Sequence, residues 1–229
     1  MNTWDVVIVG AGAAGLFCAG VAGQRGLKVL VIDHSDKIAE KVRISGGGRC
    51  NFTNRLLDPT APQKHFISQN PHFCRSALSR YTPQDFIDLV QKHGIAFHEK
   101  HKGQLFCDHS AEDIIRMLLA ECDAGGVTRW AGCSVTSVQH QGSEGEPGHY
   151  TLNTDQGPVT TTALVVATLN APLPANEENA LDQVVELVEQ QILLQQAQVI
   201  QGQVLEVEVQ VPLGQQLQLE SEVMAVTVK

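Results

Sequence analysis

The stretch DVVIVGAGAAGLFCAGVAGQRGLKVLVID, residues 5–33, decides the fold of this chain. It begins with the apolar run DVVIV, which is typical of a strand buried on both faces of a parallel sheet. A complete GxGxxG follows, then a helix rich in small residues that ends at Gly26, then a second apolar strand, KVLVI. Strand, glycines, helix and strand in this order predict a dinucleotide-binding βαβ unit.

Each glycine of the motif has a physical task in such a unit. Gly10 permits a tight turn, Gly12 lets the backbone approach a pyrophosphate, and Gly15 allows close packing of helix on strand. The helix N-terminus adds free N–H groups and the positive end of its dipole. Asp33 closes the second strand 18 residues beyond Gly15, where a carboxylate can accept hydrogen bonds from an adenosine ribose.

Three consecutive glycines at 46–48 are the second unusual feature, and Lys41, Arg43 and Arg49 flank them. Glycine loses more backbone entropy on folding than other residues, so the run predicts a ligand that comes close to the backbone. Exposed N–H groups and nearby cations suit a phosphate. A surface salt bridge is the alternative role for Arg49. Cys50 has no cysteine close in sequence, which favours a packed structural residue over a functional thiol.

From VIVGAGAAGLFCA at 7–19, through SGGGRCNFTN at 45–54, to ALVVAT at 163–168, the sequence resembles the BaiN-like, aminoacetone-oxidase-like FAD-dependent oxidoreductases of bacteria. The resemblance covers residues 1–168. It implies an α/β, Rossmann-like FAD/NAD(P)-binding fold of three layers, with a parallel sheet and a β-meander. It also implies FAD as cofactor, with NAD(P)H as a candidate electron donor.

The glycine motif and the resemblance together predict a set of cofactor-binding residues, whereas no catalytic residue is assigned. The predicted cofactor-binding residues are Gly10, Gly12, Ala13, Ala14, Gly15, Asp33, His34, Lys41, Ser45, Gly46, Gly47, Gly48, Arg49, Cys50, Asn51, Ala167 and Thr168.

The resemblance also divides the chain. Residues 1–168 are expected to form a FAD-binding Rossmann-like domain, with a mainly helical insertion at 59–127. After VVAT the family continues with two glycines and a substrate domain, whereas Leu169 and Asn170 follow here. Residues 169–229 are divergent and rich in Gln and Glu. Their helical and then alternating apolar spacing predicts a helix followed by a β-meander.

Composition limits the class of protein. The formal net charge of −9 predicts no nucleic-acid partner, because phosphate binding needs a basic face. Much of this acidic excess lies in residues 170–229, with nine acids and one lysine. Six cysteines without CxxC spacing predict reduced thiols in a cytoplasmic protein and no metal site. The apolar N-terminus has no basic region before it, so neither an export signal nor a membrane span is expected.

The sequence therefore predicts a FAD-dependent oxidoreductase that passes hydride between NAD(P)H and an unknown small organic substrate. The alternative is a non-catalytic dinucleotide-binding module, because the adenosine half of the site is complete and the later FAD motifs are missing. NADH consumption with an artificial electron acceptor would separate the two. A remnant without ligand is disfavoured, since every glycine of the motif is present.

Overall fold

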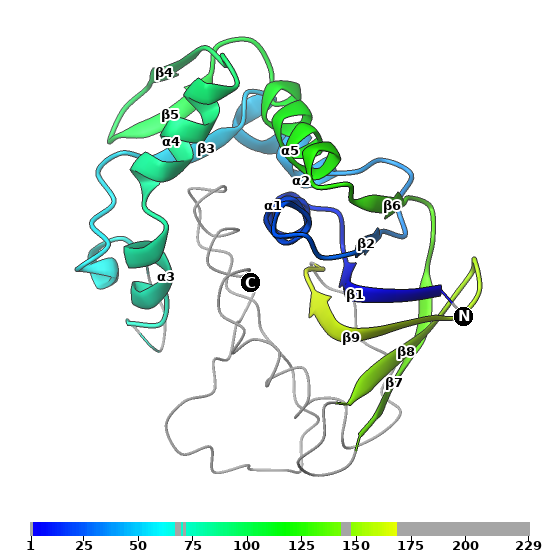
Figure 1. Cartoon of the computed structure of the whole chain (residues 1–229). Helices are drawn as coiled ribbons and strands as arrows, with labels where there is room; N and C mark the ends of the chain where they lie inside the picture. Colours follow the sequence, from blue (N-terminus) through cyan, green and yellow to red (C-terminus); the bar gives the residue numbers. More distant parts are fainter. Residues whose placement is uncertain (1, 67–69, 71, 143–147, 169–229) are drawn as a thin grey trace, which may run out of the picture.

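The computed structural model describes residues 2–66, 70, 72–142 and 148–168. Its main feature is a six-stranded sheet with the order β6-β2-β1-β9-β8-β7 (Figure 1). The strands are β1 (Asn2–Val9), β2 (Val29–Ile32), β6 (Thr128–Trp130), β7 (Val135–Gln141), β8 (His149–Thr154) and β9 (Val159–Val166). The first four in the order pair in parallel, and β8 and β7 continue the sheet antiparallel. The predicted helix and meander of 169–229 lie outside the described residues.

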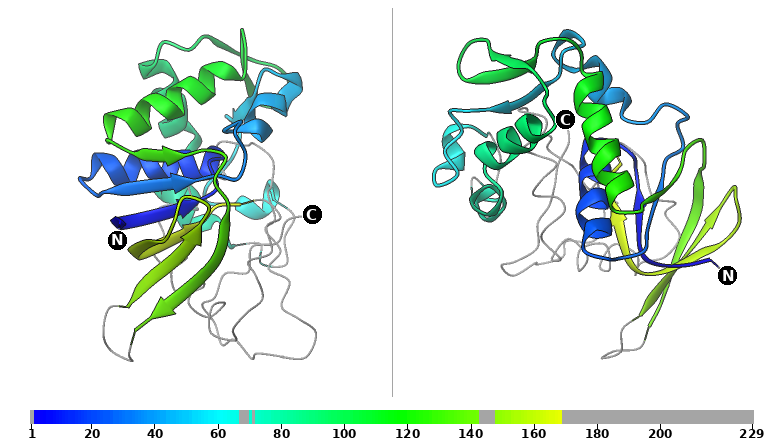
Figure 2. Two further views of the ribbon diagram at one scale, coloured as in Figure 1. Left: turned by 90° about the vertical axis from the view of Figure 1, so that its right-hand side faces the viewer. Right: turned by 45° about the horizontal axis from the view of Figure 1, so that its top comes forward.

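Two helices, α1 (Ala13–Gln24) and α5 (Glu112–Ala124), cover one face of the parallel strands (Figure 2). Small residues let them approach closely. A Cβ on Gly20 would lie 3.2 Å from the Cβ of Glu121, and one on Gly23 would lie 2.5 Å from the carbonyl oxygen of Gly125. The small-residue helix expected from the sequence is therefore packed against a second helix as well as against the sheet.

A second apolar cluster lies on the other face of the sheet. Val7 of β1 and Leu30 of β2 pack there with Leu152 of β8, whereas Val6 and Ile8 point to the helical face. This alternation is the period of two that a strand imposes on its side chains. A mainly parallel sheet with helices packed on one face, continued by antiparallel β8 and β7, confirms the expected Rossmann-like α/β fold class.

A smaller lobe stands beside the main sheet (Figure 1). It contains an antiparallel sheet with the order β3-β5-β4, two α-helices and a short 3₁₀ helix. These elements are β3 (Asn51–Asn54), η2 (Pro62–Lys64), α3 (Arg75–Arg80), α4 (Pro83–Lys92), β4 (Phe97–Glu99) and β5 (Gln104–Cys107). The segment 59–127 thus holds α3, α4 and α5 together with a β-hairpin.

Aromatic side chains join the lobe to the main sheet. The ring of Phe17 in α1 lies 6.1 Å from that of Phe86 in α4, which lies 6.0 Å from Phe52 in β3. Phe52 in turn meets Phe97 of β4 edge-on at 5.4 Å. Phe52 and Phe86 are fully buried, so one apolar core continues from the α1 layer into the lobe.

Candidate functional site

Gly10, Asp33 and Ala167 each follow directly after a parallel strand, β1, β2 and β9 respectively. Backbone hydrogen bonds hold these strand ends together: Gly10 N–H donates to Ile32 O at 2.7 Å, and Ala167 N–H donates to Val9 O at 2.8 Å. The carboxyl ends of the parallel strands thus meet at one edge. Ligands of open α/β sheets bind at such an edge.

The protein's own packing requires two glycines of the motif. Gly10 has a φ of 109°, and a Cβ there would lie 2.5 Å from the carbonyl oxygen of Ala167. A Cβ on Gly15 would overlap the carbonyl oxygen of Gly10. Gly10 therefore makes the turn and Gly15 permits the close approach of helix and turn, the tasks expected from the sequence.

Gly12 differs, because no atom of the described protein requires a glycine there. Its φ of −78° and ψ of −171° suit any residue, and nothing lies within 4 Å of a Cβ built on it. Gly12 is the N-cap of α1, and no side chain caps that end. The open space thus faces the N–H groups of the first turn, including those of Ala13 and Ala14, and fits an anionic group such as a pyrophosphate.

The Asp33 carboxylate stabilises the glycine turn between β1 and α1 through a hydrogen bond. Its Oδ2 accepts a hydrogen bond from Ala11 N–H at 2.6 Å and its Oδ1 accepts one from Ser35 N–H at 2.8 Å. A carboxylate has about four lone-pair sites, so each oxygen retains capacity for a ribose hydroxyl. The neighbouring His34 side chain is 82% exposed, with its Nδ1 3.5 Å from Asp33 Oδ1.

The three glycines at 46–48 all lie in the left-handed region, with φ of 58°, 68° and 84°. A Cβ on Gly46 would lie 2.7 Å from Asn51 N and 2.9 Å from the Phe106 ring, whereas nothing lies within 4 Å of one on Gly47 or Gly48. Backbone conformation alone accounts for glycine at all three positions. The run of glycines therefore does not by itself require a ligand, and the ligand expected from the sequence stays a prediction; the space beside Gly47 and Gly48 is open to one.

The glycine-rich loop lies between α2 (Glu40–Ile44) and the start of α5. Gly48 O accepts from Ala111 N–H at 2.8 Å and Arg49 O accepts from Cys107 N–H at 2.9 Å. The Ser45 hydroxyl donates to Val42 O at 2.8 Å. At the start of α2, which leads into the loop, Ala39 N–H donates to Ala11 O of the glycine motif at 3.0 Å. The loop is therefore connected both to the glycine motif and to the smaller lobe.

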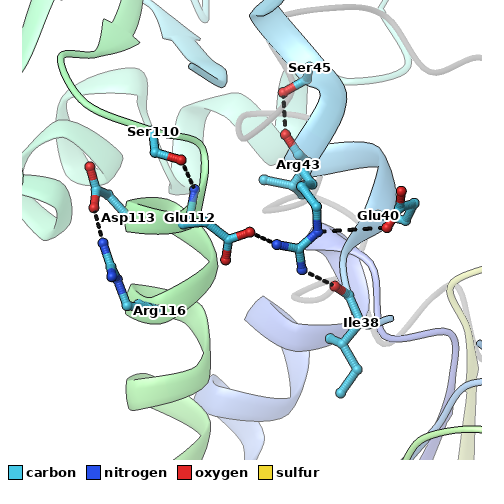
Figure 3. A network of polar contacts seen from close by, with 9 residues as sticks. Ile38, Glu40, Arg43, Ser45, Ser110, Glu112, Asp113 and Arg116 are labelled. Atoms are coloured by element: carbon cyan, nitrogen blue, oxygen red, sulfur yellow. Dashed lines mark hydrogen bonds and ion pairs between the residues drawn. The ribbon is translucent and has the colours of Figure 1, made fainter. Parts of the chain in front are cut away.

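Arg43 connects α2 to α5. Its guanidinium forms an ion pair with Glu112 of α5, lies 3.6 Å from Glu40 Oε2, and donates to Ile38 O at 3.2 Å (Figure 3). Sequence reasoning placed Arg43 among the cations for phosphate and missed Glu112, because no local pattern links residues so far apart. Lys41 and Arg49 are exposed and make no ion pair within the described residues.

Cys50 and Asn51 lie inside the protein. Burial raises the pKa of the Cys50 thiol to about 11, and a hydrogen bond with Ser45 offsets this only in part. The side chain is therefore a thiol at neutral pH, which favours the packing role. Asn51 is also buried, and its amide, oriented to satisfy both groups, donates to Thr53 O and Leu105 O at 3.3 Å.

The part of the chain that the structure describes contains neither a metal-binding cluster nor a helix that could span a membrane. No cluster of three or more His, Cys, Asp or Glu side chains there has the arrangement of a metal site. None of the helices described is long and apolar enough to cross a bilayer.

The glycine turn, the acid after β2 and the end of β9 at one sheet edge define a dinucleotide-binding protein of the Rossmann class. The chain belongs to the family described as HI0933-like protein Rossmann domain, which matches residues 4–193.

Two curated relatives are each 51% identical to this chain, and both are named ribosomal RNA dihydrouridine synthase. The one from Escherichia coli (strain K12) matches over 174 residues, 76% of this chain and 41% of its own length. The one from Haemophilus influenzae matches over 133 residues, 58% of this chain and 32% of its own. The chain thus spans less than half the length of either relative.

A 3-dehydro-bile acid delta(4,6)-reductase from Clostridium scindens is 23% identical over 135 residues, 58% of this chain and 32% of its own length. The resemblance to the BaiN-like oxidoreductases is therefore a distant one. The family to which the chain is shown to belong is the HI0933-like Rossmann family.

Solved structures share the fold at low identity. Glycine oxidase from Geobacillus kaustophilus superposes with a TM-score of 0.51 at 14% identity, over 73% of this chain and 56% of its own. L-Proline dehydrogenase from P. horikoshii gives a TM-score of 0.52 at 12% identity, over 73% and 53%. These similarities support the fold class.

Proposed function

We propose that this chain binds FAD at the carboxyl edge of β1, β2 and β9 and is the cofactor-binding part of a flavoenzyme that reduces uridine in ribosomal RNA. One observation carries the first half: Gly12 stands at an uncapped helix N-terminus beside open space, although the protein's own packing does not require glycine there. The second half rests on the name of the two relatives that share 51% identity.

The chain's own residues bind and orient the cofactor in this proposal. The N–H groups at the start of α1, beside Gly12, hold the pyrophosphate, and Asp33 accepts from the ribose. Gly47 and Gly48 leave space along the loop, and the exposed side chains of Lys41 and Arg49 supply positive charge to the phosphates. Cys50 packs the base of the loop.

Bound FAD would supply the redox chemistry, in which a hydride from NAD(P)H and a proton together saturate the C5–C6 double bond of uracil. NAD(P)H becomes NAD(P)⁺ and uridine becomes dihydrouridine. The sequence predicted a small organic substrate, whereas the reacting group proposed here is a uracil base carried on RNA. This departs from the expectation of no nucleic-acid partner, whose basis, the acidic excess, lies mostly in residues 170–229.

Flavin binding is tested on the purified 229-residue chain by its visible absorption spectrum before and after addition of FAD. We expect a bound-flavin spectrum in the native chain and none in G12V, with both proteins equally folded by circular dichroism. A colourless native chain that takes up no FAD would contradict the proposal. A chain that holds FAD but oxidises no NADH with an artificial acceptor would match the alternative, a non-catalytic module.

The RNA substrate is tested separately with a chimera. Residues 1–168 of this chain replace the matching part of the Escherichia coli relative in a strain that lacks that enzyme, and dihydrouridine in ribosomal RNA is measured by mass spectrometry. We expect the modification to be restored, and to be lost again with G12V. A folded, FAD-bound chimera that restores nothing would contradict the RNA half of the proposal alone.

A further inference from the structure

Charge is segregated between the two parts of this chain. Residues 41–110 hold ten Lys and Arg against five Asp and Glu, whereas the remainder of 1–168 holds five against eleven. Six of the nine histidines also fall within 41–110. We call residues 41–110 the basic lobe. It comprises α2 from Lys41 onward, the glycine-rich loop, β3, α3, α4, β4 and β5, most of which stand together beside the main sheet (Figures 1 and 2).

Many cations of the basic lobe face solvent without an acidic partner. Arg43, Arg55 and Lys92 are paired with Glu112, Glu99 and Glu121. Seven others are exposed and form no ion pair with a described residue. These are Lys41, Arg49, Lys64, Arg75, Arg80, Lys100 and Lys102. A folded surface usually intersperses both signs, so a one-sided excess of this kind is suited to a polyanion.

The hairpin of the lobe connects this charge to the candidate site. His98 of β4 stands opposite Phe106 of β5, their rings stacked at 6.3 Å, and Lys100 Nζ lies 5.2 Å from the Phe106 ring centroid. The same Phe106 ring lies against Gly46 of the glycine-rich loop, so near that a Cβ there would be 2.9 Å away. A polyanion on the hairpin would therefore lie next to the loop proposed to line the cofactor.

We propose that the exposed cations of the basic lobe, in particular Arg75, Arg80, Lys100 and Lys102, form the surface on which the phosphate backbone of the RNA substrate docks. This inference rests on the proposed function, because it names the surface that would hold that substrate. Phosphate contacts fix position and supply affinity without reading sequence. The lobe would thus hold the RNA while the reacting base reaches the flavin.

The test uses the full 229-residue chain and a fluorescein-labelled single-stranded RNA oligonucleotide of mixed sequence. Fluorescence anisotropy gives the affinity over a series of salt concentrations. Two charge-reversed variants change the lobe, K100E/K102E in the hairpin and R75E/R80E in α3. A third, R25E/R116E, makes the same change in net charge at the C-cap of α1 and on α5, outside the lobe. Thermal unfolding checks that all of them fold.

We expect each lobe variant to bind RNA at least about tenfold more weakly at about 0.1 M salt, with a salt slope lower by about 1.4 for two lost phosphate contacts. R25E/R116E should bind nearly as the native chain does. Equal affinity of the lobe variants and the native chain would overturn the inference, as would an equal loss in R25E/R116E.

FAD content, measured in parallel, separates this inference from the proposed function. RNA binding through the lobe in a chain without flavin would leave the inference standing and contradict the flavin site. A flavin-bound native chain with no affinity for RNA would overturn both the docking surface and the RNA substrate. Unchanged binding by folded lobe variants of an RNA-binding, flavin-bound chain would overturn the docking surface alone.

Discussion

Arg43 in α2 and Glu112 in the first turn of α5 form an ion pair across 69 residues of sequence. The pair attaches the helix that leads into the glycine-rich loop to the helix that packs on α1. Ala111, next to Glu112, holds the same loop through its hydrogen bond to Gly48 O. The position of the loop thus depends on α5, an element that makes none of the predicted cofactor contacts.

Removal of this pair should weaken FAD binding more than it weakens the fold. Both side chains are more than a third exposed, so R43A and E112A should each lower the free energy of unfolding by about 1 kcal/mol or less. Their coupling energy should be about 0.5 kcal/mol in a double-mutant cycle. Fluorescence titration should show several-fold weaker FAD binding. R116A, which breaks only the exposed pair with Asp113, is the control and should bind FAD normally.

The same added methyl group should destabilise the fold far more at Gly15 than at Gly12. G15A places a Cβ onto a backbone oxygen and should destabilise the fold by about 3 kcal/mol or more. G12A meets no protein atom and should cost less than about 1 kcal/mol, while larger side chains at 12 should abolish FAD binding. Urea unfolding gives the first quantity and flavin absorbance the second. A stable G12V that retains FAD would contradict the placement of the pyrophosphate beside Gly12.

Substitution by alanine should destabilise the fold more at Gly46 than at Gly47. G47A should cost about 1–2 kcal/mol, because the left-handed conformation alone disfavours alanine, and G47N should cost less, since asparagine tolerates that region. G46A should cost more, because its Cβ would also crowd Asn51 N at 2.7 Å. Free energies of unfolding for the three variants test this order. Equal costs for G46A and G47A would contradict the packing described for Gly46.

Glu121 should make stability depend on pH. Burial opposes its ionisation, but hydrogen bonds from Gln24, His93 and Lys92 outweigh burial and lower the pKa of its carboxyl below the ordinary 4.5. A lowered pKa in the folded state stabilises the protein above pH 4.5, and this stabilisation is lost as the pH falls through the folded-state pKa.

The matching experiment compares E121Q with the native chain. E121Q should be less stable by about 1–2 kcal/mol near neutral pH, and the difference should shrink below pH 4.5. D123N is the control on the same helix, because Asp123 is 65% exposed and its pair with Arg129 should contribute little. A difference for E121Q that is constant from pH 3 to pH 7 would contradict the role given to the ionised carboxylate.

Residues 5–33 were sufficient to predict the βαβ unit, its two strands and the tasks of Gly10 and Gly15. These features depend on backbone conformation and on contacts between neighbouring elements, which short-range sequence patterns record. The hairpin of β4 and β5, which turns at Lys102 and Gly103, is a short-range feature of the same kind.

Tertiary structure alone decided three other matters. It showed that Gly46 is crowded by Phe106, that Arg43 pairs with Glu112 and not with the open site, and that most of the exposed cations without an ion pair lie in the basic lobe. Each depends on residues far apart in sequence that packing brings together. A linear pattern records the conformation of each segment, whereas the choice of partners follows from how the segments share one core.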